Sequence, residues 1–500
     1  MNDFFRKIFY EKLDLFKRVF FDTFSSLSQT AEYPFILRDF KNDKNVYPDN
    51  ISLERLDFLV CLAKDIRKFI QKSNSRELPF IVLDNFLKSF IREFEDFNIL
   101  ERNITFLLNS LKFSLYFAFN KKIHLFNYLE EINYNLENLL KSIITVDYSY
   151  KSFILNEIES LELMVKKFIK NKDVKTEEKR ILKSIIYKLD WLKINIKNNR
   201  LKAYSWDKEK KDEYYERLIK ESLFINKKPK EIVKMIKEIF YENIDLYEKL
   251  LEKSENNRKE DNKEKIYKFK KIKFLIRITL LEIYNKFKKD FPLKFKFNLN
   301  SIKILETPSF FSNFWPLAAY FRNSLYVNLE NLKSFGEIEK MLKLILIHEI
   351  YPGHLYQELF VKESKNFITK HITIPTFYEG WSLYLENLAL DRLDLNEQER
   401  LNFIKFKLLR CIRSIYDLKV NVSYLEDNKD LNRMLTQAQK IKIINNSYLD
   451  YLKEKVQVNP GYYLSYVFGY IQFLDLHKKF KVGYNIIKNG EIPFWFLKNN

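Results

Sequence analysis

The sequence predicts a mainly α, multi-helical protein with one small β-sheet, and its glycine usage is the first reason. Only 7 of 500 residues are glycine, against roughly 35 at ordinary usage. The first 335 residues contain none. Rossmann and P-loop nucleotide sites need clustered glycines beside phosphate, so both are excluded. Sandwiches and barrels with many tight hairpins are disfavoured, because their turns need residues with positive φ.

Residues 1–290 show helical periodicity almost throughout. Between Pro79 and Pro229 there is neither glycine nor proline, so no residue interrupts long helices there. In residues 84–100, apolar side chains recur at spacings of three and four, as one buried face of a helix requires. We therefore predict that 1–290 forms a helical region enclosing a cleft, and that 291–500 forms a second region that carries the chemistry.

The charge balance is strongly basic, with 87 lysines and arginines against 67 acidic residues, a net charge of +20. Such an excess can indicate nucleic acid or an anionic surface as the partner, and a basic helical binding protein stays open as an alternative. However, lysines and glutamates are mixed over residues 209–221, as on a solvated helix surface. We therefore expect no nucleic-acid partner.

Hydropathy and cysteine content indicate the compartment. No stretch of about 18 uncharged apolar residues is present, so we expect no membrane span. The first residues carry charges every few positions and lack an apolar core, unlike a signal peptide. Cys61 and Cys411 cannot form a disulfide framework, and their apolar neighbours predict that both are buried. A soluble cytoplasmic protein is the expectation.

The pattern changes from helix to strand near Pro292. Apolar and polar residues alternate over 293–300 and again over 324–329, which is the period of a half-buried strand. The most apolar helix of the chain follows at 341–350. The sequence thus predicts a small sheet next to that helix, and helices from there to the C-terminus.

Two of the five histidines lie in one phrase, His-Glu-Ile-Tyr-Pro-Gly-His, at residues 348–354. A His-Glu pair on a buried helix is typical of zinc hydrolases, in which the imidazole binds zinc and the carboxylate, here Glu349, takes a proton from water. The second histidine is usually four residues on, but Pro352 holds that place and His354 comes two residues later. A turn broken at the proline and glycine would bring His354 back beside His348. The alternative is a helix end with two incidental histidines.

A third ligand is expected from a carboxylate on a following helix. Glu379 begins the phrase Glu-Gly-Trp-Ser-Leu-Tyr-Leu-Glu. Glu386, seven residues further on, shares its helical face, so one carboxylate can bind the metal while the other holds a ligand in place. The alternative for Glu379 is an acidic side chain that interacts with a helix dipole.

Three tyrosines near the C-terminus are candidates for contact with a reacting group. Hydrolysis of an amide develops negative charge on the carbonyl oxygen, and a phenol can stabilise that charge by donating a hydrogen bond. Tyr466 is the first candidate for this role, with Tyr462 and Tyr463 behind it.

Arg410, Arg413 and Asp417 lie together on one predicted apolar helix. An arginine at this place could hold a carboxylate of a substrate in a bidentate pair. It could equally pair with Asp417, which is itself a candidate for a supporting role around the site. The sequence leaves both interpretations open.

The order and spacing of these motifs resemble the bacterial domain-of-unknown-function 885 family (DUF885). The resemblance rests on His-Glu-x-x-Pro-Gly-His followed by Glu-Gly-Trp-x-Leu-Tyr-x-Glu. Three further segments are similar to the family pattern: 308–329, 410–418 and 459–469. Members of the family are mostly helical and zinc metallopeptidase-like, related in layout to gluzincins.

The resemblance implies a site with one zinc ion per chain. His348, His354 and Glu379 would be the metal ligands. Glu349 would be the general base, and Tyr466 would donate a hydrogen bond to the transition state.

Three positions depart from the family pattern. Leu355 and Asn421 stand where the family often has histidine, and Val467 stands where the residue is often basic. The metal ligands are unaffected, but substrate contacts are changed. A metal-binding helical scaffold without turnover therefore stays open as an alternative.

Taken together, the motifs predict zinc-dependent hydrolysis of peptide bonds in a multi-helical, metallopeptidase-like architecture. Strand 324–329 is expected at the edge of the cleft, where an extended peptide substrate can add as a further strand. A carboxypeptidase-like action is suggested by Arg410 or Arg413 as a clamp on a substrate carboxylate.

Overall fold

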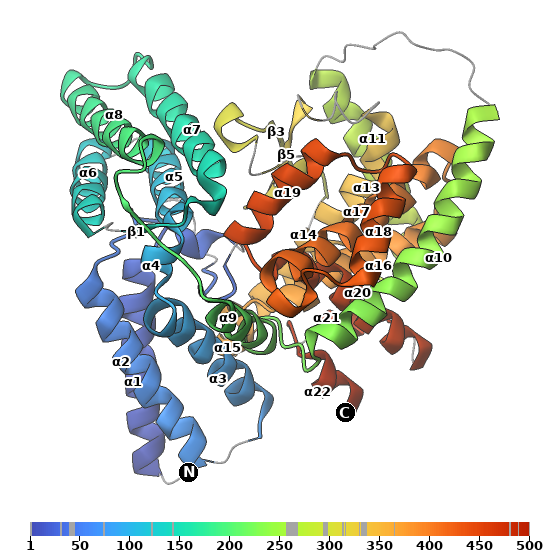
Figure 1. Ribbon diagram of the computed structural model, residues 1–500, viewed down its shortest axis with the longest axis horizontal. Helices are drawn as coiled ribbons and strands as arrows, with labels where there is room; N and C mark the ends of the chain where they lie inside the picture. The colour runs from blue at the N-terminus through green and yellow to red at the C-terminus, as the bar shows by residue number, and fades with distance from the viewer. Residues whose placement is uncertain are drawn as a thin grey trace. The chain divides into compact units, whose positions relative to one another are not determined.

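The computed structural model confirms a mainly α protein with only small sheets (Figure 1). Among the described residues, no helix combines the length and the apolar character that crossing a membrane requires. The structure describes residues 3–30, 33–39, 46–73, 76–121, 124–142, 145–256, 269–293, 299–312, 315, 317–329, 331, 338–364, 366–479, 482–488 and 490–499.

The chain divides into two compact units. They are Met1–Ser222 with Asn366–Thr373, called unit 1, and Leu223–Lys365 with Ile374–Asn500, called unit 2. The sequence suggested a boundary between two regions at residue 290. In the structure, the two compact units instead meet in the sequence at Ser222. The reason is that α10 (Pro229–Asn256) packs along α17 (Glu397–Asn421), so it belongs with the C-terminal helices.

Unit 1 consists of amphipathic helices that bury one apolar face each. In α8, for example, buried leucines and isoleucines recur every three or four residues. Cys61 of α2 is exposed, so the prediction of its burial was wrong: its neighbours Val60 and Leu62 point inward and it does not. The helices of unit 1 are α1 (Asp3–Thr23), α2 (Leu53–Ser73), α3 (Leu78–Ile91), α4 (Ile99–Arg102), α5 (Ile104–Lys121), α6 (Leu125–Ser142), α7 (Lys151–Ile169), α8 (Thr176–Lys197), α9 (Lys208–Glu221) and α15 (Phe367–His371).

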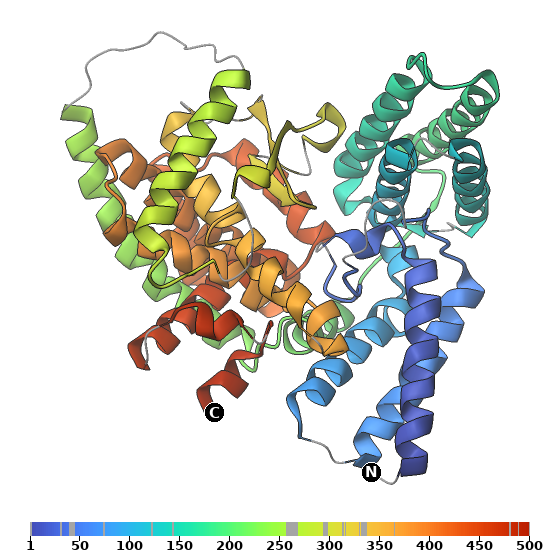
Figure 2. The ribbon, with the colours of Figure 1, turned by 180° about the vertical axis from the view of Figure 1, so that it is seen from behind.

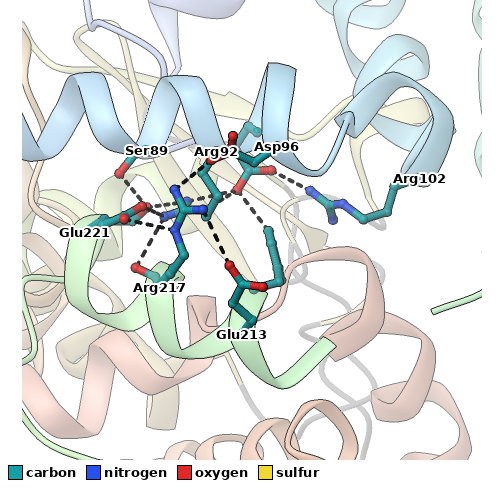
Figure 3. A network of polar contacts seen from close by, with 10 residues as sticks. Ser89, Arg92, Asp96, Arg102, Glu213, Arg217 and Glu221 are labelled. Carbon is teal, nitrogen blue, oxygen red and sulfur yellow. Dashed lines mark hydrogen bonds and ion pairs between the residues drawn. The ribbon is translucent and has the colours of Figure 1, made fainter. Parts of the chain in front are cut away.

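A buried network of charges joins the end of α3 to α9 within unit 1 (Figure 3). Arg92 and Arg102 share the carboxylate of Glu93, and Arg92 also donates to Glu221 of α9 at 2.9 Å. The chain is π-helical over Arg92–Asp96. Every charge in this group has an opposite partner, which is the condition for charges to be tolerated in a protein interior.

Unit 2 has a core in which α16 crosses α20 at very short range (Figure 1). A Cβ atom added to Gly380 would lie 2.4 Å from the Cα of Gly469, so neither position accepts a side chain without movement of the backbone. The remaining helices of unit 2 pack around this pair. They are α10, α11 (Phe269–Phe287), α13 (Glu339–Glu349), α14 (His354–Glu363), α16 (Pro375–Arg392), α17, α18 (Lys429–Lys440), α19 (Asn446–Val458), α20 (Tyr462–Lys479), α21 (Tyr484–Ile487) and α22 (Phe494–Asn499).

The small sheet beside α13 has three strands, β3 (Lys303–Glu306), β4 (Ala318–Phe321) and β5 (Ser324–Val327), in the order β3-β5-β4 (Figure 2). β5, which is the predicted strand 324–329, is therefore the central strand and not the edge. It pairs with β3 on one side and with β4 on the other, so its backbone has no free side for a peptide. Most of the other predicted strand, 293–300, lies outside the described residues.

Candidate metal centre

The helix that carries the His-Glu pair breaks where the sequence predicts it. α13 ends at Glu349 and α14 begins at His354, with a cis peptide before Pro352 between them. At Gly353 a Cβ atom would lie 1.9 Å from the carbonyl oxygen of His348, so the backbone passes too close for any side chain. This close return places the two imidazole rings with their centroids 4.7 Å apart.

Glu379, on the first turns of α16, meets both imidazoles. Its Oε2 lies 3.6 Å from Nε2 of His348 and 3.5 Å from Nε2 of His354. All three side chains are buried, and one ligand atom of each lies within 4.8 Å of the others. Oε2 has no hydrogen-bond partner among the described residues, although it is buried. A buried carboxylate oxygen without a partner is unfavourable unless a further group, such as a cation, occupies the space between the three residues.

Glu386 holds the imidazole of His348 from the opposite side. Its Oε1 lies 2.7 Å from Nδ1 of His348, two turns of α16 beyond Glu379. Arg410 of α17 donates two hydrogen bonds to Glu386, at 2.7 and 2.9 Å. This arrangement leaves Nε2 as the free nitrogen of the ring and fixes its direction. Glu386 thus has the supporting place that its helical spacing suggested.

His354 is held by three side chains that the sequence reasoning missed. The Oγ of Ser382 lies 3.2 Å from Nδ1 of His354 and donates to the carbonyl oxygen of His348 at 3.1 Å. Gln357 Oε1 lies 3.2 Å from the same Nδ1. The ring of Tyr378 stacks on the imidazole, with centroids 3.9 Å apart. Helical spacing could have indicated two of them, because Ser382 and Gln357 each lie three residues after a predicted ligand.

The carboxylate of Glu349 faces the edge of the sheet. Its Oε2 accepts a hydrogen bond from the backbone N–H of Tyr320 in β4 at 2.8 Å. The N–H of Asn328 donates to the carbonyl oxygen of Leu317, and hydrogen-bonded pairs alternate along an antiparallel ladder. The pair of Tyr320 with Leu325 is therefore a non-hydrogen-bonded one, and the N–H of Tyr320 points away from β5. Glu349 and the outer side of β4 therefore lie together.

Two of the three predicted tyrosines reach the histidines and Glu379. Tyr462 donates to Oε1 of Glu379 at 3.1 Å, and its hydroxyl lies 3.0 Å from that of Tyr466. The ring of Tyr466 stacks over His348 at 6.3 Å. Burial raises the pKa of the Tyr466 phenol well above 10, so it keeps its proton and can donate. Tyr463 points elsewhere and lies beneath the guanidinium of Arg413.

The three charged residues predicted on α17 separate in the structure. Arg410 belongs to the support of His348, as described above. Asp417 accepts from the backbone N–H of Gly461 at 3.1 Å and from Asn421 at 2.9 Å. It thus holds the turn from which α20 and its tyrosines begin. Arg413 donates from Nε to the hydroxyl of Tyr448 at 2.7 Å.

The electrostatics of the cluster favour a cation. Glu349, Glu379 and Glu386 supply three negative charges and Arg410 one positive charge, which leaves two negative charges when the imidazoles are neutral. Burial lowers the pKa of His348, but Glu379 and Glu386 outweigh burial and raise it to about 9. Burial raises the pKa of Glu379, and the two imidazoles reverse this and lower it. Positive charge is thus stabilised at the point where the three ligand atoms converge.

Fold and site together define a mainly α protein with a buried His, His, Glu constellation on three helices, α13, α14 and α16. The chain belongs to the family described as bacterial protein of unknown function (DUF885), whose model matches residues 150–485. No curated protein matches the sequence.

Two solved structures have similar folds over nearly the whole chain. One is a "putative lipoprotein of unknown function" from Shewanella oneidensis, with a TM-score of 0.65 and 14% identity over 99% of this chain and 98% of that one. The other is described as "the putative lipoprotein from Colwellia psychrerythraea", with a TM-score of 0.66 and 14% identity over 98% of both chains. At this identity the likeness concerns the fold alone.

Proposed function

We propose that this protein is a zinc-dependent peptidase. The observation that carries the proposal is the convergence of the ligand atoms of His348, His354 and Glu379, with the buried Oε2 of Glu379 lacking a hydrogen-bond partner among the described residues. Two imidazoles and one carboxylate are a ligand set of catalytic zinc sites, which keep a further position open. Zinc, when bound, supplies a Lewis acid that lowers the pKa of a water molecule and polarises a carbonyl group.

The residues around the ligands supply the other functions that hydrolysis needs. Glu349 follows a ligand directly in the chain and has a carboxylate oxygen held by β4, and we assign it the transfer of a proton from water to the leaving amine. Tyr466 has a half-buried phenol whose ring stacks on His348 and whose raised pKa keeps it protonated, and we assign it the hydrogen bond to the oxygen of the scissile carbonyl.

The sheet offers a place for an extended peptide, but on a different strand from the one that the sequence indicated. β5 is paired on both sides, whereas the described strands leave the outer side of β4 without a strand partner. The N–H of Tyr320 on that side already donates to Glu349. A peptide that adds to β4 by backbone hydrogen bonds would therefore run past the general base.

Metal analysis and digestion together test the proposal. We expect about one zinc per chain after purification in zinc, lost in His348→Ala and kept in Glu349→Gln. A peptide mixture should be cleaved by the wild type, not by Glu349→Gln, and not in the presence of a chelator. Protein that binds no metal at neutral pH would overturn the proposal. Bound metal with no chelator-sensitive cleavage would instead favour the scaffold without turnover.

A further inference from the structure

Arg413 lies one turn of α17 after Arg410, the arginine that donates to Glu386 beside the candidate metal centre. Its Nε donates to the phenol of Tyr448, and the guanidinium lies over the ring of Tyr463 at 5.6 Å. Among the described residues no acidic side chain pairs with it. The side chain is only partly exposed, so it has lost much of its water without gaining a negative charge in return.

Arg410 provides the internal comparison on the same helix. Its guanidinium lies over the ring of Tyr466 at 5.7 Å, and its donors are bound to both oxygens of Glu386. The two arginines thus stack on two tyrosines of α20 in the same way, one turn apart. Only Arg413 keeps its terminal nitrogens without hydrogen bonds to described residues. The sequence indicated both arginines as candidates for a clamp on a substrate carboxylate. Arg410 is already bound to the carboxylate of Glu386.

We propose that Arg413 binds the C-terminal carboxylate of the peptide, which makes the enzyme a carboxypeptidase. This inference rests on the proposed function, because it places the scissile bond at His348, His354 and Glu379. A guanidinium with two free nitrogens matches a carboxylate by two parallel hydrogen bonds. A clamp on the terminal carboxylate corresponds to release of residues from the C-terminus of the peptide.

The distribution of charge favours this direction of binding. With zinc bound and both imidazoles neutral, the charges of the centre sum to zero, so a peptide carboxylate is drawn to the cation of Arg413. Arg410 is neutralised by Glu386, whereas Arg413 forms no ion pair with a carboxylate among the described residues. A terminal carboxylate bound to Arg413 would supply the anionic partner that Tyr448 and Tyr463 do not provide.

The experiment compares N-acetylated peptides of one sequence that end either in a free carboxylate or in an amide. With zinc-loaded wild type, mass spectrometry should show release of residues from the C-terminus of the free acid, with kcat/KM at least about 10-fold above that for the amide. Arg413→Gln should lower kcat/KM for the acid by about 10- to 100-fold and leave the amide unchanged. Arg413→Lys should be intermediate. Arg433→Gln, which removes an exposed arginine of α18, is the matched control.

A binding measurement separates this inference from the proposed function. Glu349→Gln loaded with zinc should bind the acid more tightly than the amide in calorimetry, whether or not the wild type turns over. Equal binding and equal cleavage of acid and amide would overturn the carboxylate clamp. An amide that carries a glutamate near its end and is cleaved as fast as the free acid would also overturn it, because Arg413 would then recognise an acidic side chain.

Discussion

Oε1 of Glu386 lies 2.7 Å from Nδ1 of His348, on the opposite side of the imidazole from Nε2, which faces Glu379 at 3.6 Å. A ring held in this way presents one nitrogen to a metal in one direction. Groups that orient a metal-binding imidazole typically contribute 10- to 100-fold to metal affinity, by order of magnitude about 1–3 kcal/mol.

Glu386→Gln should therefore weaken zinc binding by about 10- to 100-fold. The amide keeps an acceptor for the imidazole but loses the charge that Arg410 neutralises, so the guanidinium is left buried without its partner. Competition with a chromogenic chelator measures the affinity. Asp391→Asn, an exposed change of the same charge on α16, should leave it unchanged. Equal losses in both variants would show that only net charge matters.

Ser382→Ala should weaken zinc binding by about 10-fold with little loss of stability. The Oγ atom connects Nδ1 of His354 to the carbonyl oxygen of His348, so it fixes the distance between the two rings. The same chelator competition measures the effect. Ser89→Ala removes an equally buried hydroxyl in unit 1 and serves as the control. An unchanged zinc affinity in Ser382→Ala would show that this hydroxyl does not contribute to metal binding.

Gly353→Ala should abolish metal binding. The added Cβ would lie 1.9 Å from the carbonyl oxygen of His348, so the turn must open and His354 must move away from His348. Zinc content after dialysis is the measurement, with circular dichroism to confirm folding. Gly483→Ala is the control, since its Cβ would meet its nearest atom, the carbonyl oxygen of Asp290, at 3.2 Å. A folded Gly353→Ala protein with a full complement of zinc would contradict the role given to this turn.

Tyr466→Phe should lower kcat by about 100-fold while zinc content stays constant, because one donor to a developing oxyanion contributes about 2.7–4 kcal/mol. The control is Tyr470→Phe, one turn further along α20, whose hydroxyl donates to Asn387 at 2.9 Å. If the two variants behave alike, or if Tyr462→Phe alone carries the loss, the assignment to Tyr466 is wrong.

A pH-dependent stability term is expected in unit 1. Burial raises the pKa of Asp49 from 3.8 to about 6, although Ser26 and Ser110 donate hydrogen bonds to it. Because the folded pKa is the higher one, the folded protein binds the extra proton, and stability falls as pH rises from about 4 to about 6. Asp49→Asn cannot ionise. It should gain stability relative to wild type between pH 4 and pH 7.5, by a few kcal/mol as an order of magnitude.

Urea unfolding at the two pH values measures this difference. Asp57→Asn, an exposed change on α2, is the control and should show no such trend. A constant difference between wild type and Asp49→Asn would mean that the carboxylate is already neutral, or already stabilised, throughout this range.

Local sequence was sufficient for the features that depend on a few neighbouring residues. The scarcity of glycine and the helical periodicity predicted the fold class, and the position of Pro352 and Gly353 predicted the break that turns His354 back toward His348. Glu379 and Glu386 could be placed on one helical face because seven residues make two turns. Each of these inferences follows from backbone geometry over less than three turns of helix.

Only the tertiary structure decided the order of the strands, the division of the chain and the partners of each charge. Strand β5 is central because a segment before it and a segment further upstream pair with it from both sides, and no local pattern encodes that order. Arg410 and Arg413 look alike in sequence, yet one meets Glu386 and the other meets a tyrosine, since α16 and α19 approach α17 at different heights. The sequence by itself determined which chemical groups the site can use, because helix periodicity is local. The structure decided which of these groups remain free for a substrate. The reason is that packing between helices far apart in the sequence is not a local property.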